Sequence, residues 1–551
     1  MTGRCDSFDG LRRSGGISGF PKREESVHDA FNTGHSATSI SAALGLLAGE
    51  RILGGKGTAV AVIGDGALTG GLAYEGLSHA GQLGLPLVVI LNDNKMSIGP
   101  NVGSLSKYLS RLTMKARYQN FRRRVDFIVK RIPFFGDFFY DIIVRMKRGI
   151  KAVFYPENFF VDLGFEYVGP IDGHQLPVLE QVLSDVRQLG KPVVVHVLTR
   201  KGKGYEFAEE DPSSFHGVSS FSITEGLVEK RGDPTFTDAF GKAVLALGGE
   251  DQRVVAITAA MEKGTGLSAF HAAFPDRFFD VGIAEQHAVT FAAGMAARGL
   301  RPIVAIYSTF AQRAMDQIIH DVAVQNLPVI FALDRAGFVG DDGETHQGLF
   351  DLSLLKAIPN LSILCPATAT ELEQMLRWAL SQEGPTAIRY PKAACPSLAL
   401  NQNLELGRGA LLTHSGASSL IAFTGSLYAQ AIAASDLLAL RGIDVDLYNL
   451  RFIKPIDEEY LAALLSRYEH VLIVEEAVKS GGFGEYTASL IDRFKLSTKL
   501  QILAAPDHFP SHASREELLA QAKLDAEGIM NTLSAQLPVR ENLRILKTSV
   551  L

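Results

Sequence analysis

Short apolar runs alternate with longer segments of helical pattern along most of the chain. Three such runs lie in its first part, "TAVAVIGDG" at residues 58–66, "LPLVVILNDN" at 85–94 and "KPVVVHVLT" at 191–199. Runs that are apolar at nearly every position are typical of parallel strands covered on both faces. Because helical segments separate the runs, the pattern predicts a doubly wound α/β layer. A helix is expected from about Ser36 to Gly54, ahead of the first run.

The same alternation recurs twice further along the chain. A second group of runs contains "RVVAITAAM", "RPIVAIYSTF", "LPVIFALDRAG" and "GPTAIRYPK", and a third contains "SLIAFTGS", "VDLYNLR", "HVLIVEEA" and "KLQILAAPD". The length of 551 residues agrees with about three domains. We therefore predict three doubly wound α/β domains with mostly parallel sheets, at residues 1–230, 231–400 and 401–551.

Composition narrows the class of protein. Hydrophobic residues make up 46% and charged residues 21% of the chain, as in ordinary globular proteins, and the net charge of −6 does not favour nucleic acid or an anionic membrane. Cys5, Cys365 and Cys395 lie far apart, which excludes a disulfide framework and a zinc site of the CxxC type. We find no apolar run of membrane-spanning length and no apolar core of a signal peptide. A cytoplasmic protein is expected.

Residues 107–151 differ in composition from the rest. They carry 13 Lys or Arg against three Asp, interleaved with aromatic side chains. A basic amphipathic segment can lie on a membrane surface or contact nucleic acid, but a run of charge is more often a solvated face. We interpret the segment as an insertion into the first domain, at about residues 104–160, whose Phe and Ile side chains pack on that domain.

Polar side chains follow two successive strands of the first domain. Asp65 lies between two glycines at the end of the first run, and Asn94 follows the next run 29 residues later. One βαβ crossover brings neighbouring strand ends together over about this separation, at the edge of the sheet where ligands bind. The Asp-Gly pair alone is also a common turn. Together, two oxygen-bearing side chains predict a site for Mg²⁺, which would neutralise a diphosphate.

A carboxyl group occupies a similar place in the second domain. The segment "FFDVGIAEQHAVTFAAG" at 278–294 puts Glu285 between a predicted strand and a predicted helix. A carboxyl there suits general acid–base chemistry, and it also suits capping of the helix start. The residues alone leave both interpretations open.

These segments resemble a known family. Gly64-Asp65-Gly66 followed by Asn94 is similar to the diphosphate and metal signature of thiamine-diphosphate enzymes. "GIAEQHAVTFAAG", "PIVAIYSTFAQRAMDQIIHDV" and "DRAGFVGDDGETHQGLFD" resemble the 1-deoxy-D-xylulose-5-phosphate synthase family more closely than transketolase or the β-subunit of pyruvate dehydrogenase. The resemblance implies transketolase-like domains: a diphosphate- and Mg-binding one, a pyrimidine-binding one with a catalytic Glu, and a C-terminal one.

The resemblance also implies cofactor and metal roles. Asp65 and Asn94 would ligate Mg²⁺ through their side chains, and Met96 would do so through its backbone carbonyl. Glu285 would exchange a proton with the aminopyrimidine ring of thiamine diphosphate. The other cofactor-binding residues implied are Gly64, Gly66, Ala67, Lys201, Tyr307 and Phe310.

The implied reaction condenses pyruvate with D-glyceraldehyde 3-phosphate, releasing CO₂ and giving 1-deoxy-D-xylulose 5-phosphate for isoprenoid, thiamine and pyridoxal precursors. Family membership further implies a homodimer. The substrate-binding residues implied are Tyr307, Arg313, Arg335, Asp342, His346 and Arg389, the last as a planar clamp on the acceptor phosphate. The catalytic residues implied besides Glu285 are Asp342, His346, His35 and His216, the last two beside the thiazolium.

Two alternatives stay open from the sequence. The resemblance begins at residue 2, whereas family members ordinarily carry some tens of residues upstream, including a histidine-bearing segment near the thiazolium. One alternative is therefore a truncated paralogue that binds the cofactor but is catalytically impaired. The other is a transketolase-like ketol transferase.

Overall fold

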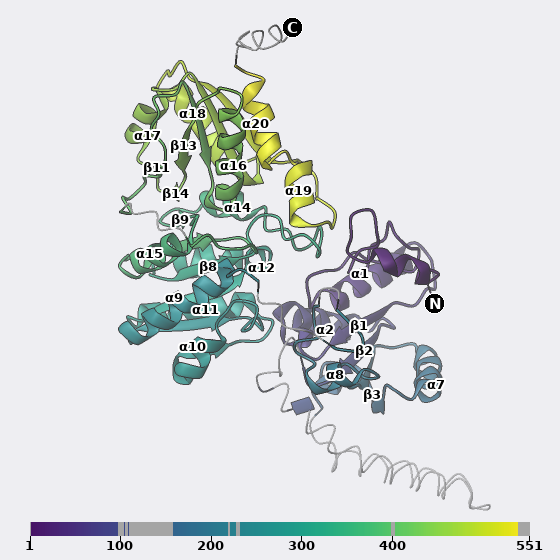
Figure 1. The fold of residues 1–551 in the computed structure, drawn as a ribbon. Helices are drawn as coiled ribbons and strands as arrows, with labels where there is room; N and C mark the ends of the chain where they lie inside the picture. Colours follow the sequence, from purple (N-terminus) through teal and green to yellow (C-terminus); the bar gives the residue numbers. More distant parts are fainter. Residues whose placement is uncertain are drawn as a thin grey trace, which may run out of the picture. The chain divides into compact units, whose positions relative to one another are not determined.

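The computed structural model describes residues 2–96, 104, 108–109, 158–218, 221–226, 232–397 and 403–537. These residues belong to two compact units (Figure 1). The smaller unit draws on residues 35–230 and 281–284, and the larger unit on 1–34, 231–280 and 285–551. The basic segment lies outside the described residues except for Tyr108 and Leu109. In the described part of the chain, no helix is long and apolar enough to cross a membrane.

The smaller unit is built on a parallel sheet whose inner strands are covered on both faces. The expectation of cover on both faces is wrong for the edge strand β1 (Val60–Gly64), because Val60 and Val62 on one of its faces are 51% and 61% exposed. The strands of this sheet run in the order β1-β2-β4-β3. The helices and strands are α1 (Ser39–Ile52), β1 (Val60–Gly64), α2 (Gly71–Leu83), β2 (Val88–Asp93), α6 (Phe159–Asp162), β3 (Glu166–Asp172), α7 (Leu176–Arg187), β4 (Val193–Leu198) and α8 (Glu206–Glu210). The expected first helix is α1, which ends just before Gly54, a glycine with a φ of +78°.

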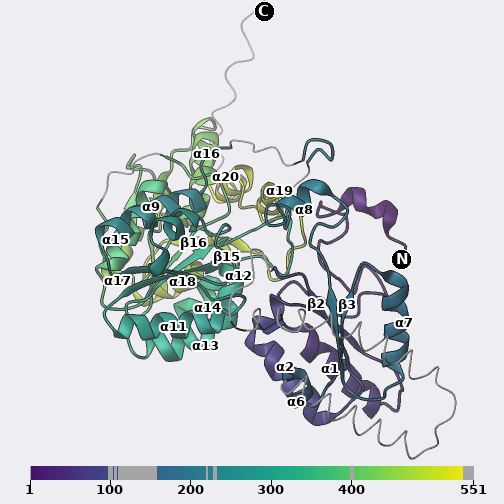
Figure 2. The same cartoon turned by 90° about the horizontal axis from the view of Figure 1, so that it is seen from below.

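The core of the smaller unit explains its layers. Leu47 of α1 and Leu77 of α2 pack with Ile63 on one face of the sheet, and Val186 of α7 packs with Val195 on the other. In Figure 2, α1 and α2 accordingly lie on one side of the strands and α7 on the other. The parallel strands place the residues that follow β1, β2 and β4 at the same edge of the sheet.

The larger unit contains two sheets. A seven-stranded sheet has the order β14-β9-β10-β8-β7-β5-β6, parallel except for β14 against β9. Its elements are α9 (Phe236–Glu250), β5 (Val254–Thr258), α10 (Ser268–Ala273), β6 (Phe278–Asp280), α11 (Glu285–Ala297), β7 (Arg301–Tyr307), α12 (Ser308–Ala311), α13 (Met315–Gln317), β8 (Ile330–Asp334), α14 (Asp351–Lys356), β9 (Ser362–Leu364), α15 (Ala369–Leu380), β10 (Thr386–Arg389) and β14 (Phe452–Lys454). Figure 2 shows α9 and α15 on one side of this sheet and α11, α13 and α14 on the other.

The second sheet of the larger unit has the order β11-β13-β12-β15-β16, parallel except for the edge strand β11. Its elements are β11 (Ala410–Leu411), β12 (Ser419–Phe423), α16 (Tyr428–Ala439), β13 (Asp446–Asn449), α17 (Glu458–Leu465), β15 (His470–Val478), α18 (Phe483–Arg493), β16 (Lys499–Ala505), α19 (Arg515–Gln521) and α20 (Ala526–Ser534). Leu438 of α16 and Leu533 of α20 pack with Phe423 on one face. Figure 1 shows α17 and α18 on the opposite face.

The fold is the mostly parallel α/β type that the sequence predicts. One strand joins an unexpected neighbour, because β14 lies in the predicted third domain (401–551) and pairs with β9 of the predicted second domain (231–400). Residues 2–34 belong to the larger unit. The exact domain boundaries at 230 and 400 stay predictions.

Candidate active site

Asp65 lies at the strand-end edge of the smaller unit. Strands β1 and β2 pair in parallel, so the expected meeting of their ends is confirmed. Asp65 is 3% exposed, and its Oδ2 accepts a hydrogen bond from the Lys95 backbone N–H at 2.8 Å. Lys95 has a φ of +63°, and its N–H also lies 3.1 Å from Asp93 Oδ1. The Asn94 side-chain oxygen accepts from the Met96 N–H at 3.0 Å, so Asn94 and Met96 lie in one turn, which the Lys95 N–H joins to Asp65.

The surroundings of Asp65 and Asp93 shift the pKa values of their carboxyl groups in opposite directions. Burial and the neighbouring Asp93 raise the pKa of Asp65 to about 7. Burial alone would also raise the pKa of Asp93, but His196 outweighs it, and the pKa of Asp93 is lowered. His196 Nε2 lies 3.0 Å from Asp93 Oδ2, while Tyr167 Oη lies 2.7 Å from its Nδ1. Asp93 is thus held by a protein partner, whereas a cation would stabilise the ionised form of Asp65.

A cavity of about 420 Å³ opens beside these residues. Asn94, Met96 and Lys201 are among the residues that line it. Burial lowers the pKa of Lys201, and the charge of Asp65 opposes that shift. Gly66 and Ala67 continue from Gly64 and Asp65 into a short helical turn, which Thr69 closes by donating to the Gly66 carbonyl at 2.7 Å.

The two histidines expected near the thiazolium also belong to the smaller unit. His35 is half-buried just ahead of α1, and His216 is exposed on the segment after α8. The backbone N–H of His216 donates to the Ser213 carbonyl at 3.3 Å. Their catalytic roles stay predictions.

Glu285 opens α11 in the larger unit. The side chain is 2% exposed, and Arg313 Nε lies 3.4 Å from its Oε2. Burial raises the pKa of Glu285, and the positive charge of Arg313 opposes the shift. Among the described residues, Oε2 has no hydrogen-bond partner. A buried carboxyl with spare hydrogen-bonding capacity and a raised pKa is suited to exchange a proton with a ligand.

Aromatic rings lie near the carboxyl ends of β7 and β8. Tyr307 and Phe310 stack with ring centroids 5.7 Å apart, and the Arg335 guanidinium lies 3.6 Å from the Tyr307 ring. Burial raises the pKa of Tyr307 to about 12. Asp334, fully buried at the end of β8, accepts from the Thr237 hydroxyl at 2.7 Å, and burial raises its pKa to about 6. Asp334 was not among the residues predicted from the sequence, although an Asp that ends an apolar strand is the same signal that singled out Asp65.

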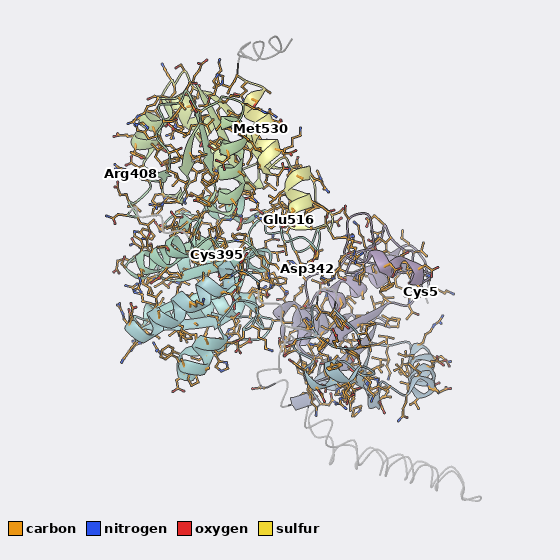
Figure 3. All side chains as sticks on the ribbon, viewed as in Figure 1. Cys5, Asp342, Cys395, Arg408, Glu516 and Met530 are labelled. Carbon is orange, nitrogen blue, oxygen red and sulfur yellow. The ribbon has the colours of Figure 1, made fainter. Side chains whose placement is uncertain are left out.

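Asp342 and His346 lie together on the loop that follows β8, and Asp342 is labelled in Figure 3. Three N-terminal side chains contact this loop: Arg12 forms an ion pair with Asp342, Phe20 stacks on the His346 ring at 4.7 Å, and Lys22 Nζ lies 2.5 Å from Glu344. The His346 ring also forms a T-shaped contact with Phe310, with ring centroids 5.6 Å apart. These N-terminal partners could not be predicted from the sequence, because residues about 330 positions apart carry no local signal of their contact.

Arg389 has different surroundings from those expected of a phosphate clamp. Its side chain is 2% exposed, and its Nε donates to Asp351 at 2.8 Å. One terminal nitrogen donates to the backbone carbonyl of Glu476 at 3.0 Å. These contacts make Arg389 a buried link between β10, α14 and β15. Its proposed role at a substrate phosphate stays a prediction.

Each unit, taken by itself, carries residues that fit one part of thiamine diphosphate. Asp65, Asn94 and the Met96 carbonyl form an all-oxygen set, which suits Mg²⁺ beside a diphosphate. This set differs in kind from a cluster of three His, Cys, Asp or Glu side chains, and the described residues contain no such cluster. In the larger unit, the buried Glu285 oxygen without a hydrogen bond is matched to a nitrogen of a bound ring.

Comparisons with known proteins match nearly the whole chain. Residues 1–199 match the family described as "1-deoxy-D-xylulose-5-phosphate synthase", residues 233–397 "Transketolase, pyrimidine binding domain", and residues 409–529 "Transketolase, C-terminal domain". A 1-deoxy-D-xylulose-5-phosphate synthase of Treponema pallidum (strain Nichols) is 53% identical over 532 residues, which cover 96% of this chain and 84% of that protein. One of Clostridium tetani is 48% identical over 531 residues, 96% of this chain and 86% of that protein.

A solved structure agrees with the fold. "Split gene transketolase, inactive beta4 tetramer" is 29% identical and superposes with a TM-score of 0.50, covering 55% of this chain and 98% of that one. Fold and site together define a thiamine-diphosphate protein of transketolase type. Within that class, the chain belongs to the 1-deoxy-D-xylulose-5-phosphate synthase family.

Proposed function

We propose that the chain condenses pyruvate with D-glyceraldehyde 3-phosphate to give 1-deoxy-D-xylulose 5-phosphate and CO₂, with thiamine diphosphate and Mg²⁺. The family match over 96% of the chain supports this reaction. The observation in the structure that carries it is Glu285, a buried carboxyl at a helix start with a raised pKa and an oxygen left without a hydrogen bond. The comparisons favour neither a ketol transferase nor an impaired paralogue.

In the overall reaction, the bond between C1 and C2 of pyruvate breaks and the carboxylate leaves as CO₂. C2 then bonds to the aldehyde carbon of the acceptor, and the aldehyde oxygen takes up a proton. Thiamine diphosphate supplies, when bound, a nucleophilic carbon and a sink for the electron pair that decarboxylation leaves.

The chain's own residues bind, orient and move protons. Asp65, Asn94 and the Met96 carbonyl would hold Mg²⁺, and Lys201 would add positive charge beside the diphosphate. Glu285 would exchange a proton with a ring nitrogen of the aminopyrimidine, a task that its raised pKa favours because the neutral and ionised forms are closer in free energy. Phe310 would offer an apolar ring to the aminopyrimidine.

The acceptor side is assigned to the loop after β8. Asp342 and His346 lie on that loop, and His346 is held between Phe20 and Phe310. A ring whose orientation is fixed by two aromatic contacts holds its nitrogens in defined positions, which suits proton delivery to the aldehyde oxygen. His35 and His216 are proposed to act on the pyruvate side. A homodimer and a cytoplasmic location are further proposals that rest on the family resemblance.

A direct assay tests the reaction. The purified chain is incubated with thiamine diphosphate, Mg²⁺ and pyruvate, and CO₂ release is followed with and without glyceraldehyde 3-phosphate. We expect release that depends on the phosphorylated acceptor, and formation of 1-deoxy-D-xylulose 5-phosphate detected by mass spectrometry. Transfer from xylulose 5-phosphate to ribose 5-phosphate without use of pyruvate would instead identify a ketol transferase. Absence of turnover together with normal coenzyme binding would identify an impaired paralogue.

A further inference from the structure

The loop of residues 336–348 carries Asp342 and His346, and the C-terminal part of the larger unit holds both of its ends. Gly337 and Gly348 exchange two backbone hydrogen bonds at 2.8 Å, which close the loop. Phe338 and Leu349, at those ends, are each 1% exposed and belong to the same core as Phe423 of β12. The loop therefore starts and finishes inside the core of the C-terminal sheet.

A buried carboxylate fastens the first of these ends. Glu476 of β15 is 0% exposed, and its Oε1 accepts from the Phe338 backbone N–H at 2.9 Å. A Cβ at Gly337, whose φ is +83°, would lie 2.4 Å from Glu476 Cδ, so only glycine lets the carboxylate approach the loop. The other oxygen, Oε2, accepts from Arg515 Nη2 at 2.6 Å.

The start of α19 supports the middle of the same loop. A Cβ at Gly340 would lie 3.0 Å from the Ala513 carbonyl, and one at Gly343 would lie 3.1 Å from His512 Cβ. The loop backbone therefore lies directly against residues 512–515. Arg515 thus closes a bridge that joins α19, β15 and the loop through a single carboxylate.

We propose that Glu476, held by Arg515, is a positioning residue for Asp342 and His346, so that the C-terminal domain sets acceptor affinity without touching the acceptor. The role in acceptor binding rests on the proposed function, whereas the anchoring of the loop does not. An ionised carboxylate accepts hydrogen bonds from the Phe338 N–H and from Arg515 at once. A glutamine in its place would direct its NH₂ group at one of these two donors, and that hydrogen bond would be lost. Loss of either bond frees a loop end in a buried position where no water replaces it.

Glu475 provides a matched control in the neighbouring position. It is also 0% exposed, and its two oxygens accept from the Phe483 and Gly484 N–H groups at the start of α18. Within the described part of the chain, the hydrogen bonds of its carboxylate therefore go to α18, whereas those of Glu476 go to the loop and to Arg515. Both Glu476→Gln and Glu475→Gln should lower thermal stability, since each weakens a buried hydrogen-bonded carboxylate. Only Glu476→Gln should release residues 336–348.

The experiment combines hydrogen exchange with substrate kinetics on the full chain. In Glu476→Gln, we expect backbone exchange of peptides covering 336–348 to rise at least about tenfold, and the KM for glyceraldehyde 3-phosphate to rise about tenfold with that for pyruvate within about twofold. In Glu475→Gln, exchange should rise around 482–484 only, with both KM values unchanged. Adding Arg515→Met to Glu476→Gln removes the facing donor and should restore part of the loop protection.

The outcomes separate the two claims. Equal loop exchange in the two single variants, or KM values for both substrates that rise together, would overturn the positioning role. If the wild-type chain shows no turnover, the proposed function fails, and the exchange data still decide whether Glu476 anchors the loop.

Discussion

Replacing Glu285 by Gln removes a proton-exchanging group while keeping nearly the same shape. The side chain is 2% exposed, and Arg313 Nε lies 3.4 Å away, so bulk water has little access to take over the exchange. A positioned carboxyl contributes about 10²–10⁴-fold to proton transfer. We therefore expect exchange of the C2 proton of bound thiamine diphosphate to slow by about 10²–10⁴-fold in Glu285→Gln.

The same substitution should leave the coenzyme-free protein at least as stable at neutral pH. Burial raises the pKa of Glu285. A carboxyl with a pKa higher in the folded than in the unfolded chain costs stability as the pH rises through its folded pKa, because the ionised form is favoured by unfolding. Gln stays neutral throughout. The Tm of the variant minus that of the wild type should therefore increase as the pH rises from the ordinary carboxyl range toward neutrality.

Two measurements check this prediction. Acid-quenched proton NMR in D₂O reports C2 exchange with Mg²⁺ present, and thermal unfolding across pH reports stability. Glu371→Gln is a matched control, because Glu371 is 0% exposed and pairs with Arg451 Nε at 2.6 Å outside the candidate site. The control should lose stability and keep fast exchange. Equal exchange rates in the wild type and Glu285→Gln would refute the assignment of Glu285 as the activating carboxyl.

Three further perturbations test other parts of the site. Asp65→Ala should abolish the Mg²⁺-dependent rise in Tm with thiamine diphosphate, worth about 2.7 kcal/mol at a hundredfold excess of ligand over Kd. Asp93→Ala should lower the Tm through loss of its His196 contact but keep that rise. A rise in Tm that persists with chelator present would contradict the metal site. Arg389→Lys should destabilise the fold by about 1–3 kcal/mol and change both KM values alike, because the partners of Arg389 are Asp351 and a backbone carbonyl. A selective rise in the KM for the acceptor in steady-state kinetics would instead support the phosphate clamp. Phe20→Leu removes the ring stacking on His346, which is worth about 0.5–1.5 kcal/mol. The kcat/KM for the acceptor should therefore fall about two- to tenfold. An unchanged value would show that the stacking does not orient His346.

The strands that could be predicted are those whose local pattern reflects their burial. β2 and β4 could be predicted directly from apolar runs because neighbouring strands and helices cover them. The run of β1 is equally apolar, but Val60 and Val62 on one face of this edge strand are 51% and 61% exposed, so its pattern did not indicate how far it is buried. β9 and β14 have three residues each, too few to show any period, and they stabilise each other only across a distance of about 90 positions in sequence.

Site residues divide in the same way. Asp65, Asn94 and Glu285 follow strands, so sequence position alone placed them at strand ends. The partners of Asp342 and His346 come from the first 22 residues, and nothing near Arg12 or Phe20 indicates which loop they contact. The adjacent Glu475 and Glu476 interrupt an otherwise apolar strand, a visible anomaly, yet the two groups that each carboxylate holds depend on tertiary packing.

The burial of Phe338 and Leu349 in the C-terminal core has a consequence for recombination between relatives. A chimera that takes its C-terminal sheet from another member and joins it after β10 would separate this loop from the core that accepts its two ends. In such a chimera, residues 336–349 must come from the same parent as residues 409–537. The strands on either side of the loop, β8 and β9, must come from the parent that supplies the seven-stranded sheet. Crossovers that respect this split preserve the fit of both apolar side chains, and those that ignore it leave two mismatched cavities or clashes.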